Sequence, residues 1–327
     1  MFEDYSIEAN FALQAVRAAS VLCRDIQGEM VTPALSKSDR SPVTVADFAS
    51  QAVVARMLKE TLPEDPLVAE EDSHVLQKPE ERGKLTVVTE FVQRIFPDED
   101  EETVCSHIDI GRAEPSARYW TLDPIDGTKG YLRGGQYVVA LALIENGQVI
   151  LGALGCPNLN VDLQPDIGGE GATLIAVKGG GAWVLGMEGD DSNRLQVSGV
   201  ERGADARILR SFAAEHTDPD KLGRLASSLG TSHEHVLMDS QAKYALLAAG
   251  RGDLIFRLIS PDRPDYEELI WDQAAGSLIV TEAGGRVTDL NGRDLDFSSG
   301  RKLSNNVGVL ASNGVLHEQA LRALQTL

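Results

Sequence analysis

The segment Asp123-Pro-Ile-Asp-Gly-Thr128 contains the side chains whose spacing most clearly points to chemistry. Its proline cannot continue a strand ladder and its glycine permits backbone conformations that other residues resist, so the chain must turn there. A tight turn would bring the carboxylates of Asp123 and Asp126 together and leave the Ile125 carbonyl pointing the same way. Two adjacent carboxylates repel each other, and Mg²⁺, which prefers oxygen ligands, would relieve that repulsion. An ordinary Asp/Pro/Gly turn is the alternative explanation.

Three other acids could join this pair. Glu70 stands in an acidic cluster directly after the apolar run 67–69, so it would emerge at a strand end. Asp47 falls in the first turn of an expected helix, where an acid also favours the helix dipole. Asp272 lies beside Trp271. Taken singly, the three have ordinary explanations: a solvated acidic turn, a helix cap and a residue at the edge of an apolar face.

The elements that must position these residues follow from hydrophobic periodicity. Helical spacing in the first half predicts helices over 6–27, 43–62 and 85–96. Asn146-Gly147 and the run Gly179-Gly180-Gly181 each separate two apolar stretches and predict β-hairpins. The second half alternates strands with helices, and its longest helix is expected over 266–282. Mixed and antiparallel sheets covered by helices, an α+β fold, follow from this order.

The length of 327 residues allows one large domain or two of ordinary size. A polar stretch after Gly189 predicts a boundary there. We expect an N-terminal α+β subdomain over 1–190 with the metal site, and a C-terminal α/β subdomain over 191–327 with the substrate-binding residues.

The balance of charge restricts the partners. Fifty acidic and 30 basic residues give a formal charge of -20, which disfavours general nucleic-acid binding. A small phosphorylated ligand remains open, because carboxylates can hold the cations that phosphate requires. Three well-separated cysteines predict neither a disulfide framework nor a Cys-based zinc site. No apolar run approaches the roughly 20 residues that span a bilayer, and no secretory leader is recognisable, so we expect a soluble, cytoplasmic protein without membrane contact.

An acidic run, Pro-Asp-Glu-Asp-Glu-Glu, occupies residues 97–102. Such runs usually stay solvated, so a loop is predicted. We further hypothesise that part of the segment between Glu71 and Asp123 lies near the mouth of the active site. Deleting residues 98–102 would then change the Michaelis constant more than stability.

In combination, these motifs resemble the lithium-sensitive, magnesium-dependent phosphatases of the inositol monophosphatase superfamily. The resemblance rests on Asp123–Thr128, on Val-Ala-Glu-Glu71, on Pro-Val-Thr-Val-Ala-Asp47, and on Trp271-Asp272 followed by Glu-Ala-Gly-Gly285, and it spans nearly the whole chain. It implies a layered αβαβα sandwich. The stretches 126–137 and Asp239-Ser-Gln-Ala-Lys-Tyr244 are more similar to the 3'(2'),5'-bisphosphate nucleotidases, which convert 3'-phosphoadenosine 5'-phosphate to AMP.

The resemblance also implies roles for individual residues. It assigns two or three Mg²⁺ ions to Glu70, Asp123, the Ile125 carbonyl, Asp126 and Asp272. Thr128, paired with Asp47, would orient and deprotonate the attacking water. A hydroxyl held by a carboxylate can pass on a proton, and free N–H groups at a helix start attract phosphate oxygens, so the chemistry is reasonable.

For the substrate, a small phosphorylated nucleotide, the resemblance points to Gly127, Thr128, His216, Ser240, Lys243, Arg257 and Asp272. Ser240 could equally cap the following helix, Lys243 could be solvent-exposed, and Arg257 could form an edge salt bridge. His216 could be an ordinary loop histidine.

Other functions remain open from the sequence. An inositol monophosphatase or inositol polyphosphate 1-phosphatase is the alternative enzyme, and the sulfated nucleotide precursor is an additional substrate. A non-catalytic nucleotide sensor or interaction protein on the same fold is the alternative of another class. Monomer and homodimer are not distinguished.

Overall fold

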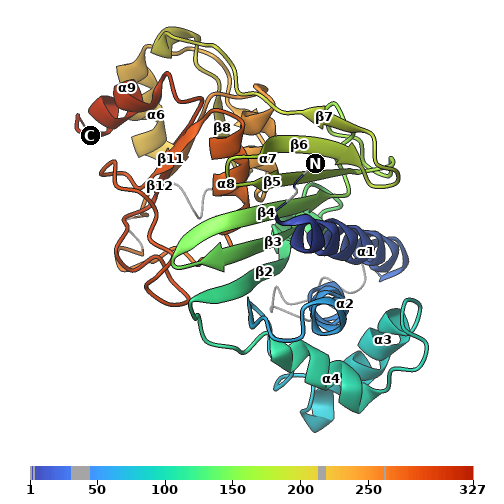
Figure 1. Cartoon of the computed structure of the whole chain (residues 1–327). Helices are drawn as coiled ribbons and strands as arrows, with labels where there is room; N and C mark the ends of the chain where they lie inside the picture. Colours follow the sequence, from blue (N-terminus) through green and yellow to red (C-terminus); the bar gives the residue numbers. More distant parts are fainter. Residues whose placement is uncertain (1, 3, 31–44, 213–218, 261–262, 327) are drawn as a thin grey trace.

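The computed structural model describes residues 2, 4–30, 45–212, 219–260 and 263–326 (Figure 1). In the first half lie helices α1 (Ser6–Met30), α2 (Val45–Thr61), α3 (Arg82–Val92), α4 (Glu101–Ile110) and α5 (Thr128–Leu132), with strands β1 (Leu67–Ala69), β2 (Arg118–Asp126), β3 (Val138–Glu145), β4 (Gln148–Cys156), β5 (Ala172–Val177), β6 (Gly181–Gly186) and β7 (Ser192–Arg194). The second half adds α6 (Pro219–Leu229), α7 (Ala242–Ala248), α8 (Ala274–Glu282), α9 (His317–Leu324), β8 (Ile208–Arg210), β9 (Val236–Leu237), β10 (Leu254–Arg257), β11 (Arg286–Thr288) and β12 (Val309–Ser312).

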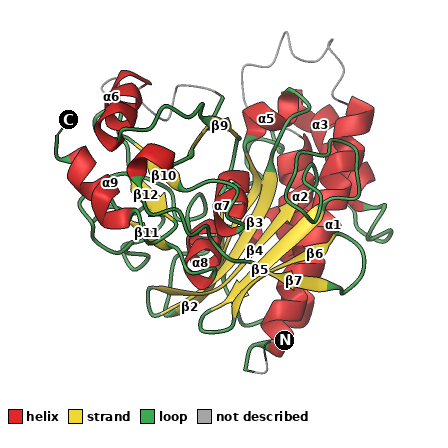
Figure 2. Cartoon of the chain, turned by 90° about the horizontal axis from the view of Figure 1, so that it is seen from above, coloured by secondary structure: helices red, strands yellow, loops and turns green. Residues whose placement is uncertain are grey.

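The larger sheet has the order β1-β2-β3-β4-β5-β6-β7. Only its first pair, β1 and β2, is parallel. Helices α1 and α2 pack on one face, and α8 covers the other with α7 beside it (Figures 1 and 2). Because helices cover both faces, strands such as β3 and β5 are apolar and buried along almost their whole length.

The smaller sheet has the order β11-β12-β10-β8-β9 and mixes parallel with antiparallel pairs. Helices α7 and α8 lie against one face of it, and α9, with α6 packed on it, lies beyond β12. The layers therefore run helix, sheet, helix, sheet, helix. This arrangement confirms the predicted αβαβα sandwich.

Both predicted hairpins are present. Asn146 and Gly147 adopt φ angles of 50° and 75° between β3 and β4, the left-handed pair that a two-residue turn requires. The three glycines from Gly179 to Gly181 connect β5 to β6 without opening a helix, so they are a turn. The helices predicted over 6–27, 43–62 and 85–96 correspond to α1, α2 and α3.

The helix expected over 266–282 begins only at Ala274. Residues 271–273 form a turn just before it, and further upstream Leu269 forms an isolated antiparallel bridge with Lys302. The apolar spacing continued through this region because Leu269, Ile270 and Trp271 are directed inward as well, so periodicity alone could not locate the helix start. Asp272 consequently lies in a turn just before α8 rather than within it.

The prediction of a solvated loop for residues 97–102 is only partly right: residues 97–100 lie outside any helix and are exposed apart from Glu99. Glu99 is buried and forms ion pairs with Arg56 and His107, and Glu101 and Glu102 begin α4. Acids are stabilising in a first helical turn because the exposed N–H groups there carry partial positive charge. Asp100 caps this helix: its side chain accepts the Thr103 N–H, and the Thr103 hydroxyl accepts the Asp100 N–H.

We therefore expect Asp100→Ala to lower the free energy of unfolding by about 1 kcal/mol, the usual cost of losing an N-cap. Chemical denaturation measures this change. Glu102→Ala, in the same turn but outside the capping box, is the matched control. Equal stability of Asp100→Ala and the unmodified chain would contradict the capping role. For the same reason, deletion of residues 98–102 should destabilise the fold, contrary to the sequence-based hypothesis.

The division at residue 190 stays a prediction. Strand β7 still pairs with β6 in the larger sheet, and the smaller sheet starts at β8.

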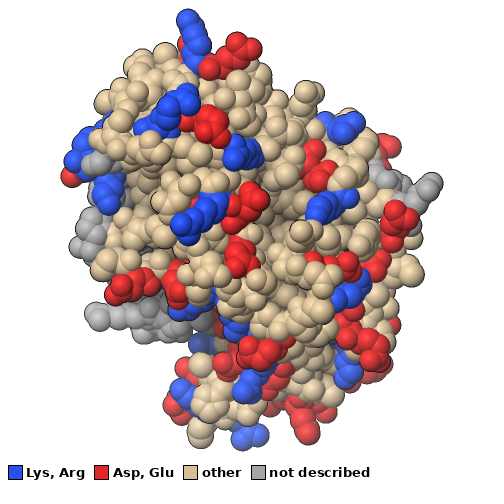
Figure 3. All heavy atoms as spheres, turned by 60° about the vertical axis from the view of Figure 1, so that its left-hand side comes forward, with Lys and Arg blue, Asp and Glu red and all other residues tan. Residues whose placement is uncertain are grey.

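Cys23, Cys105 and Cys156 are all free and buried. In the part of the chain that the structure describes, no helix is long and apolar enough to cross a membrane. On the face shown in Figure 3, acidic and basic side chains are interspersed over a largely uncharged surface.

Candidate active site

Two neighbouring strand ends create the acidic centre. Strands β1 and β2 run parallel, with Ala69 opposite Leu122, so the next residues, Glu70 and Asp123, leave the same edge of the sheet together. The register with β3 then shifts between Asp123 and Asp126, which marks the turn expected at the proline. The Asp123 Oδ1 accepts the Ile125 N–H at 3.1 Å and fixes that turn.

The carboxylates lie close enough to perturb one another. Asp123 is buried, and its pKa is well above the usual range because of burial first and then the charges of Glu70, Asp126 and Asp272. Burial likewise raises the pKa of Asp272, with Asp126 and Glu70 adding to it and Arg257 opposing it. Such an arrangement is costly for the protein unless positive charge is supplied.

Glu70 and Asp126 complete the cluster. Burial raises the pKa of Glu70, a hydrogen bond with Asp123 opposes this shift, and the charge of Asp126 adds to it. Asp126 accepts the Gln241 N–H at 2.6 Å; burial raises its pKa, while Lys243 and Arg257 lower it. The structure thus brings the four predicted acidic ligands together, from β1, β2 and the turn before α8.

Asp47 and Thr128 flank this cluster. Asp47 is buried in the first turn of α2, where its charge raises the pKa of Asp123 and of Glu71. Thr128 begins α5, and its hydroxyl donates to the Ile125 carbonyl at 3.3 Å. The predicted pairing of Thr128 with Asp47 stays a prediction.

Gly127 precedes α5 with a left-handed φ of 93°. A Cβ at this position would lie 2.9 Å from the Cβ of Ser240, so only glycine fits the close approach of the two segments. The turn after β2 is thereby packed against the start of the α7 region.

Ser240 and Lys243 lie at this contact, and both are buried. Helix α7 begins at Ala242, with Gln241 rather than Ser240 at the N-cap position, although the Ser240 hydroxyl accepts the Ala242 N–H at 3.2 Å. The Lys243 ammonium donates to the Ser240 carbonyl and the Ser211 hydroxyl. Burial lowers the pKa of Lys243 to about 8, with Asp126 opposing the shift. Solvent exposure of Lys243, the ordinary alternative, is excluded.

Arg257 ends β10 and points toward the same acids. Its guanidinium bonds Glu268 through Nε at 3.0 Å and through a second nitrogen at 2.7 Å, and lies 3.7 Å from Asp272. Glu268 is buried and also accepts from the Gln273 side chain at 2.7 Å. Arg257 therefore does form a salt bridge, as the alternative explanation proposed, but within the site rather than at an exposed sheet edge.

Sequence reasoning missed Glu268. Its available signal was an acid within the apolar context Glu-Leu-Ile-Trp271, which the expectation of a helix over 266–282 obscured. Glu71 and Gln51 were missed as well. Burial and the charge of Asp47 raise the pKa of Glu71 to about 8, and the Gln51 amide exchanges hydrogen bonds with the Glu71 backbone. His216 lies outside the described residues.

Glu268→Gln is expected to keep a hydrogen bond to Arg257 but to lose the opposing charge. The guanidinium should then be oriented less tightly, and kcat/KM for the phosphate substrate should fall about tenfold, chiefly through KM. Steady-state kinetics measures both constants. Glu267→Gln, whose partner Lys302 is exposed, is the matched control. An unchanged KM would remove Glu268 from substrate positioning.

The donor set fits a hard divalent cation. Oxygen ligands are what Mg²⁺ prefers, and the raised pKa values of Asp123 and Asp272 reflect burial and mutual repulsion, which Arg257 offsets only in part at Asp272. Among the described residues, no group of three or more His, Cys, Asp or Glu side chains is already arranged around a single metal position.

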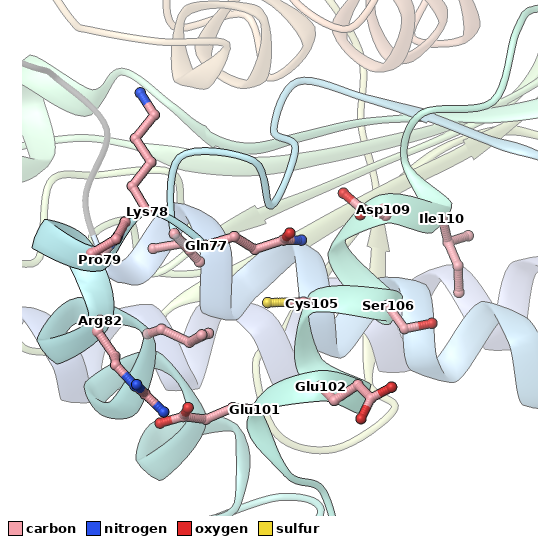
Figure 4. Close-up of a pocket in the computed structure, with 12 residues that line it drawn as sticks. Gln77, Lys78, Pro79, Arg82, Glu101, Glu102, Cys105, Ser106, Asp109 and Ile110 are labelled. Atoms are coloured by element: carbon pink, nitrogen blue, oxygen red, sulfur yellow. The ribbon is translucent and has the colours of Figure 1, made fainter.

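A cavity of about 930 Å³ lies elsewhere, between the segment after Ser73 and helix α4 (Figure 4). Figure 4 shows Lys78 and Arg82 on one side, Glu101 and Glu102 below, and Cys105 between them. None of the predicted site residues lines it. The candidate active site is thus separate from this cavity.

The sequence matches the model of the inositol monophosphatase family over residues 3–327. The chain belongs to the inositol monophosphatase family. Within it, the sequence is 41% identical to a rice (Oryza sativa) 3'(2'),5'-bisphosphate nucleotidase, an alignment covering 98% of this chain and 94% of that protein. A 3'(2'),5'-bisphosphate nucleotidase of Schizosaccharomyces pombe is 40% identical, covering 98% and 95%.

Solved inositol monophosphatase structures share the fold. The Thermotoga maritima IMPase has a TM-score of 0.66 at 22% identity, covering 97% of this chain and 96% of its own. The Anabaena inositol monophosphatase has a TM-score of 0.64 at 21% identity, covering 99% and 97%. These findings confirm the family and the fold that the motifs predicted.

Proposed function

We propose that this chain is a 3'(2'),5'-bisphosphate nucleotidase, a phosphomonoesterase that removes the 3'-phosphate of 3'-phosphoadenosine 5'-phosphate to give AMP and phosphate. Similarity of about 40% to bisphosphate nucleotidases across nearly the entire chain carries the proposal. The buried acids of the site, flanked by Lys243 and Arg257, supply the chemistry that such a substrate requires.

Enzymes of this family depend on metal ions, and we assign two or three Mg²⁺ ions to Glu70, Asp123, the Ile125 carbonyl, Asp126 and Asp272. When bound, the cations would supply positive charge to the phosphoryl oxygens and make water a stronger nucleophile at neutral pH. The bulge after Asp123 and the Gln241 N–H hold two of these carboxylates in fixed orientations.

The protein itself positions water and moves its proton. Thr128 is the first residue of α5, and Gly127 occupies the N-cap position before it. The Thr128 hydroxyl donates a hydrogen bond to the Ile125 carbonyl. Asp47, buried nearby, is the proposed acceptor of the proton that Thr128 passes on. Direct attack of water on phosphorus requires no covalent intermediate, so the buried Cys156 is left a packing role.

Substrate charge is met by Ser240, Lys243 and Arg257, together with the backbone at Gly127 and Thr128; His216 is proposed as a further contact. Lys243 and Arg257 are held by neighbouring oxygen atoms at present distances of 2.7–3.0 Å, so their donors are oriented before a phosphate arrives. Such preorganisation lowers the entropic cost of binding.

The test compares substrates at equal magnesium. We expect kcat/KM for 3'-phosphoadenosine 5'-phosphate to exceed that for inositol 1-phosphate by at least about a hundredfold, because only the nucleotide can use two phosphate contacts of roughly 1.5–3 kcal/mol each. Phosphate release measures both reactions. A preference for inositol 1-phosphate would reject the nucleotidase assignment, and an absence of turnover with either would favour a binding protein. The sulfated precursor is included as a further substrate.

A further inference from the structure

Phe212 is unusual among the large apolar residues near the site. It follows β8, and its side chain is 55% exposed. Its neighbour Ser211 accepts a hydrogen bond from the Lys243 ammonium at 3.0 Å, so the chain that carries Phe212 adjoins a residue proposed to hold the substrate phosphate. An apolar ring that stays this exposed gains little from the hydrophobic effect, so the position is not explained by core packing.

Arg133 lies beside this ring. It directly follows α5, the helix that Thr128 begins, and its guanidinium carbon is 6.0 Å from the centre of the Phe212 ring. The Arg133 side chain is 48% exposed, so the pair forms part of the surface. Two segments distant in sequence thus place an aromatic face and a planar cation together.

Asp239 fixes both members to the site. This buried carboxylate accepts the Phe212 N–H at 3.1 Å through one oxygen and pairs with Arg133 through the other. It immediately precedes Ser240, and its second oxygen faces Gly130 in α5. The positions of Phe212 and Arg133 are therefore tied to the backbone that presents Ser240 and Lys243.

We propose that the open surface of Phe212, with Arg133 at its side, is the platform on which the nucleobase of the substrate stacks. This inference rests on the proposed function and names the part of the site that selects a nucleotide. Aromatic side chains bind bases of any type by stacking, and a guanidinium adds a cation–π contribution. The platform would therefore favour a nucleotide over a sugar phosphate without dictating which base it carries.

The experiment compares 3'-phosphoadenosine 5'-phosphate with ribose 3,5-bisphosphate, which carries the same phosphates but no base. In Phe212→Leu, the ratio of kcat/KM for the nucleotide to kcat/KM for the ribose ester should fall about tenfold, which is the contribution expected from one stacked base. Phe212→Trp restores an aromatic face and should retain the ratio of the unmodified enzyme. Ile167→Ala, at another exposed apolar residue, is the control for a general surface effect.

The outcomes are distinct. An unchanged ratio of the two kcat/KM values in Phe212→Leu would overturn the inference. If both values fell by the same factor, the role of Phe212 would be structural. Failure of Phe212→Trp to retain the ratio would also count against stacking. If the unmodified chain hydrolyses neither phosphate ester, the proposed function itself fails. If it hydrolyses both with equal kcat/KM, the function stands and the base platform is rejected.

Discussion

Asp123→Asn is expected to lower kcat for 3'-phosphoadenosine 5'-phosphate by about a thousandfold or more. The carboxylate stands in the acidic cluster, where burial and the charges of Glu70, Asp126 and Asp272 all raise its pKa. An amide of the same shape keeps one oxygen but removes the negative charge that holds a cation. Loss of several kcal/mol of transition-state stabilisation corresponds to this factor. Initial rates at saturating substrate and magnesium measure it.

The same substitution should make the metal-free protein more stable. The pKa of Asp123 is higher in the folded chain than in the unfolded chain, so folding is penalised as pH rises above about 4, the unfolded value. The penalty grows until the pH passes the raised pKa of the folded chain, and Asp123→Asn removes it. Magnesium should in turn stabilise the unmodified chain more than the variant, because ligand that binds only the folded state raises its stability. Thermal unfolding with and without magnesium tests both expectations.

Asp162→Asn, at an exposed loop position, is the matched control for both measurements. It should leave turnover and the effect of magnesium unchanged. Turnover unaffected by Asp123→Asn would show that the catalytic assignment is wrong. Loss of turnover with full magnesium stabilisation would instead separate catalysis at Asp123 from cation binding.

The acidic centre could be predicted because its ligands stand at chain positions with strong local signals. A proline and a glycine force the turn after Asp123, and an apolar run ends just before Glu70. Their convergence depends on the parallel pairing of β1 with β2, which no local sequence pattern predicts. Asp272 was assigned through the family resemblance, because its place beside Trp271 alone favoured an ordinary residue at the edge of an apolar face, and its local structure was predicted incorrectly.

The remaining features depend on tertiary contacts that no local pattern encodes. Glu268 matters because Arg257 and Gln273 meet it in space. The acidic run before α4 is ordered because Arg56, a residue of α2, neutralises Glu99. The acidic composition predicts a solvated chain there, but the Arg56–Glu99 ion pair and the Asp100 helix cap hold part of it against the fold. Such partners become evident only when the helices are packed together.

Lys243→Met is expected to lower kcat/KM for the nucleotide by about a hundredfold. A charge-assisted hydrogen bond to phosphate contributes roughly 1.5–3 kcal/mol, and Lys243 is buried where little water can replace it. Methionine preserves the apolar length of the side chain. The loss should appear mainly in KM if the ammonium contacts a phosphate that does not react, and in kcat if it contacts the transferred one.

A second readout distinguishes charge from packing. Burial lowers the pKa of Lys243 to about 8, so the side chain is cationic below that pH and neutral above it. In the unmodified enzyme, kcat/KM should therefore decline as pH rises through about 8, whereas in Lys243→Met this decline should be absent. Lys178→Met, at an exposed turn beside β6, is the control and should keep the decline.

The two measurements must agree for the assignment to hold. If Lys243→Met retained kcat/KM within twofold, about 0.4 kcal/mol, the ammonium would be a structural donor to Ser211 and Ser240 alone. If activity fell but the decline above pH 8 persisted, another group would be responsible for that limb. Only joint loss of affinity and of the alkaline limb assigns that limb to the proton of Lys243 in the free enzyme, because the pH dependence of kcat/KM reports groups of the free enzyme.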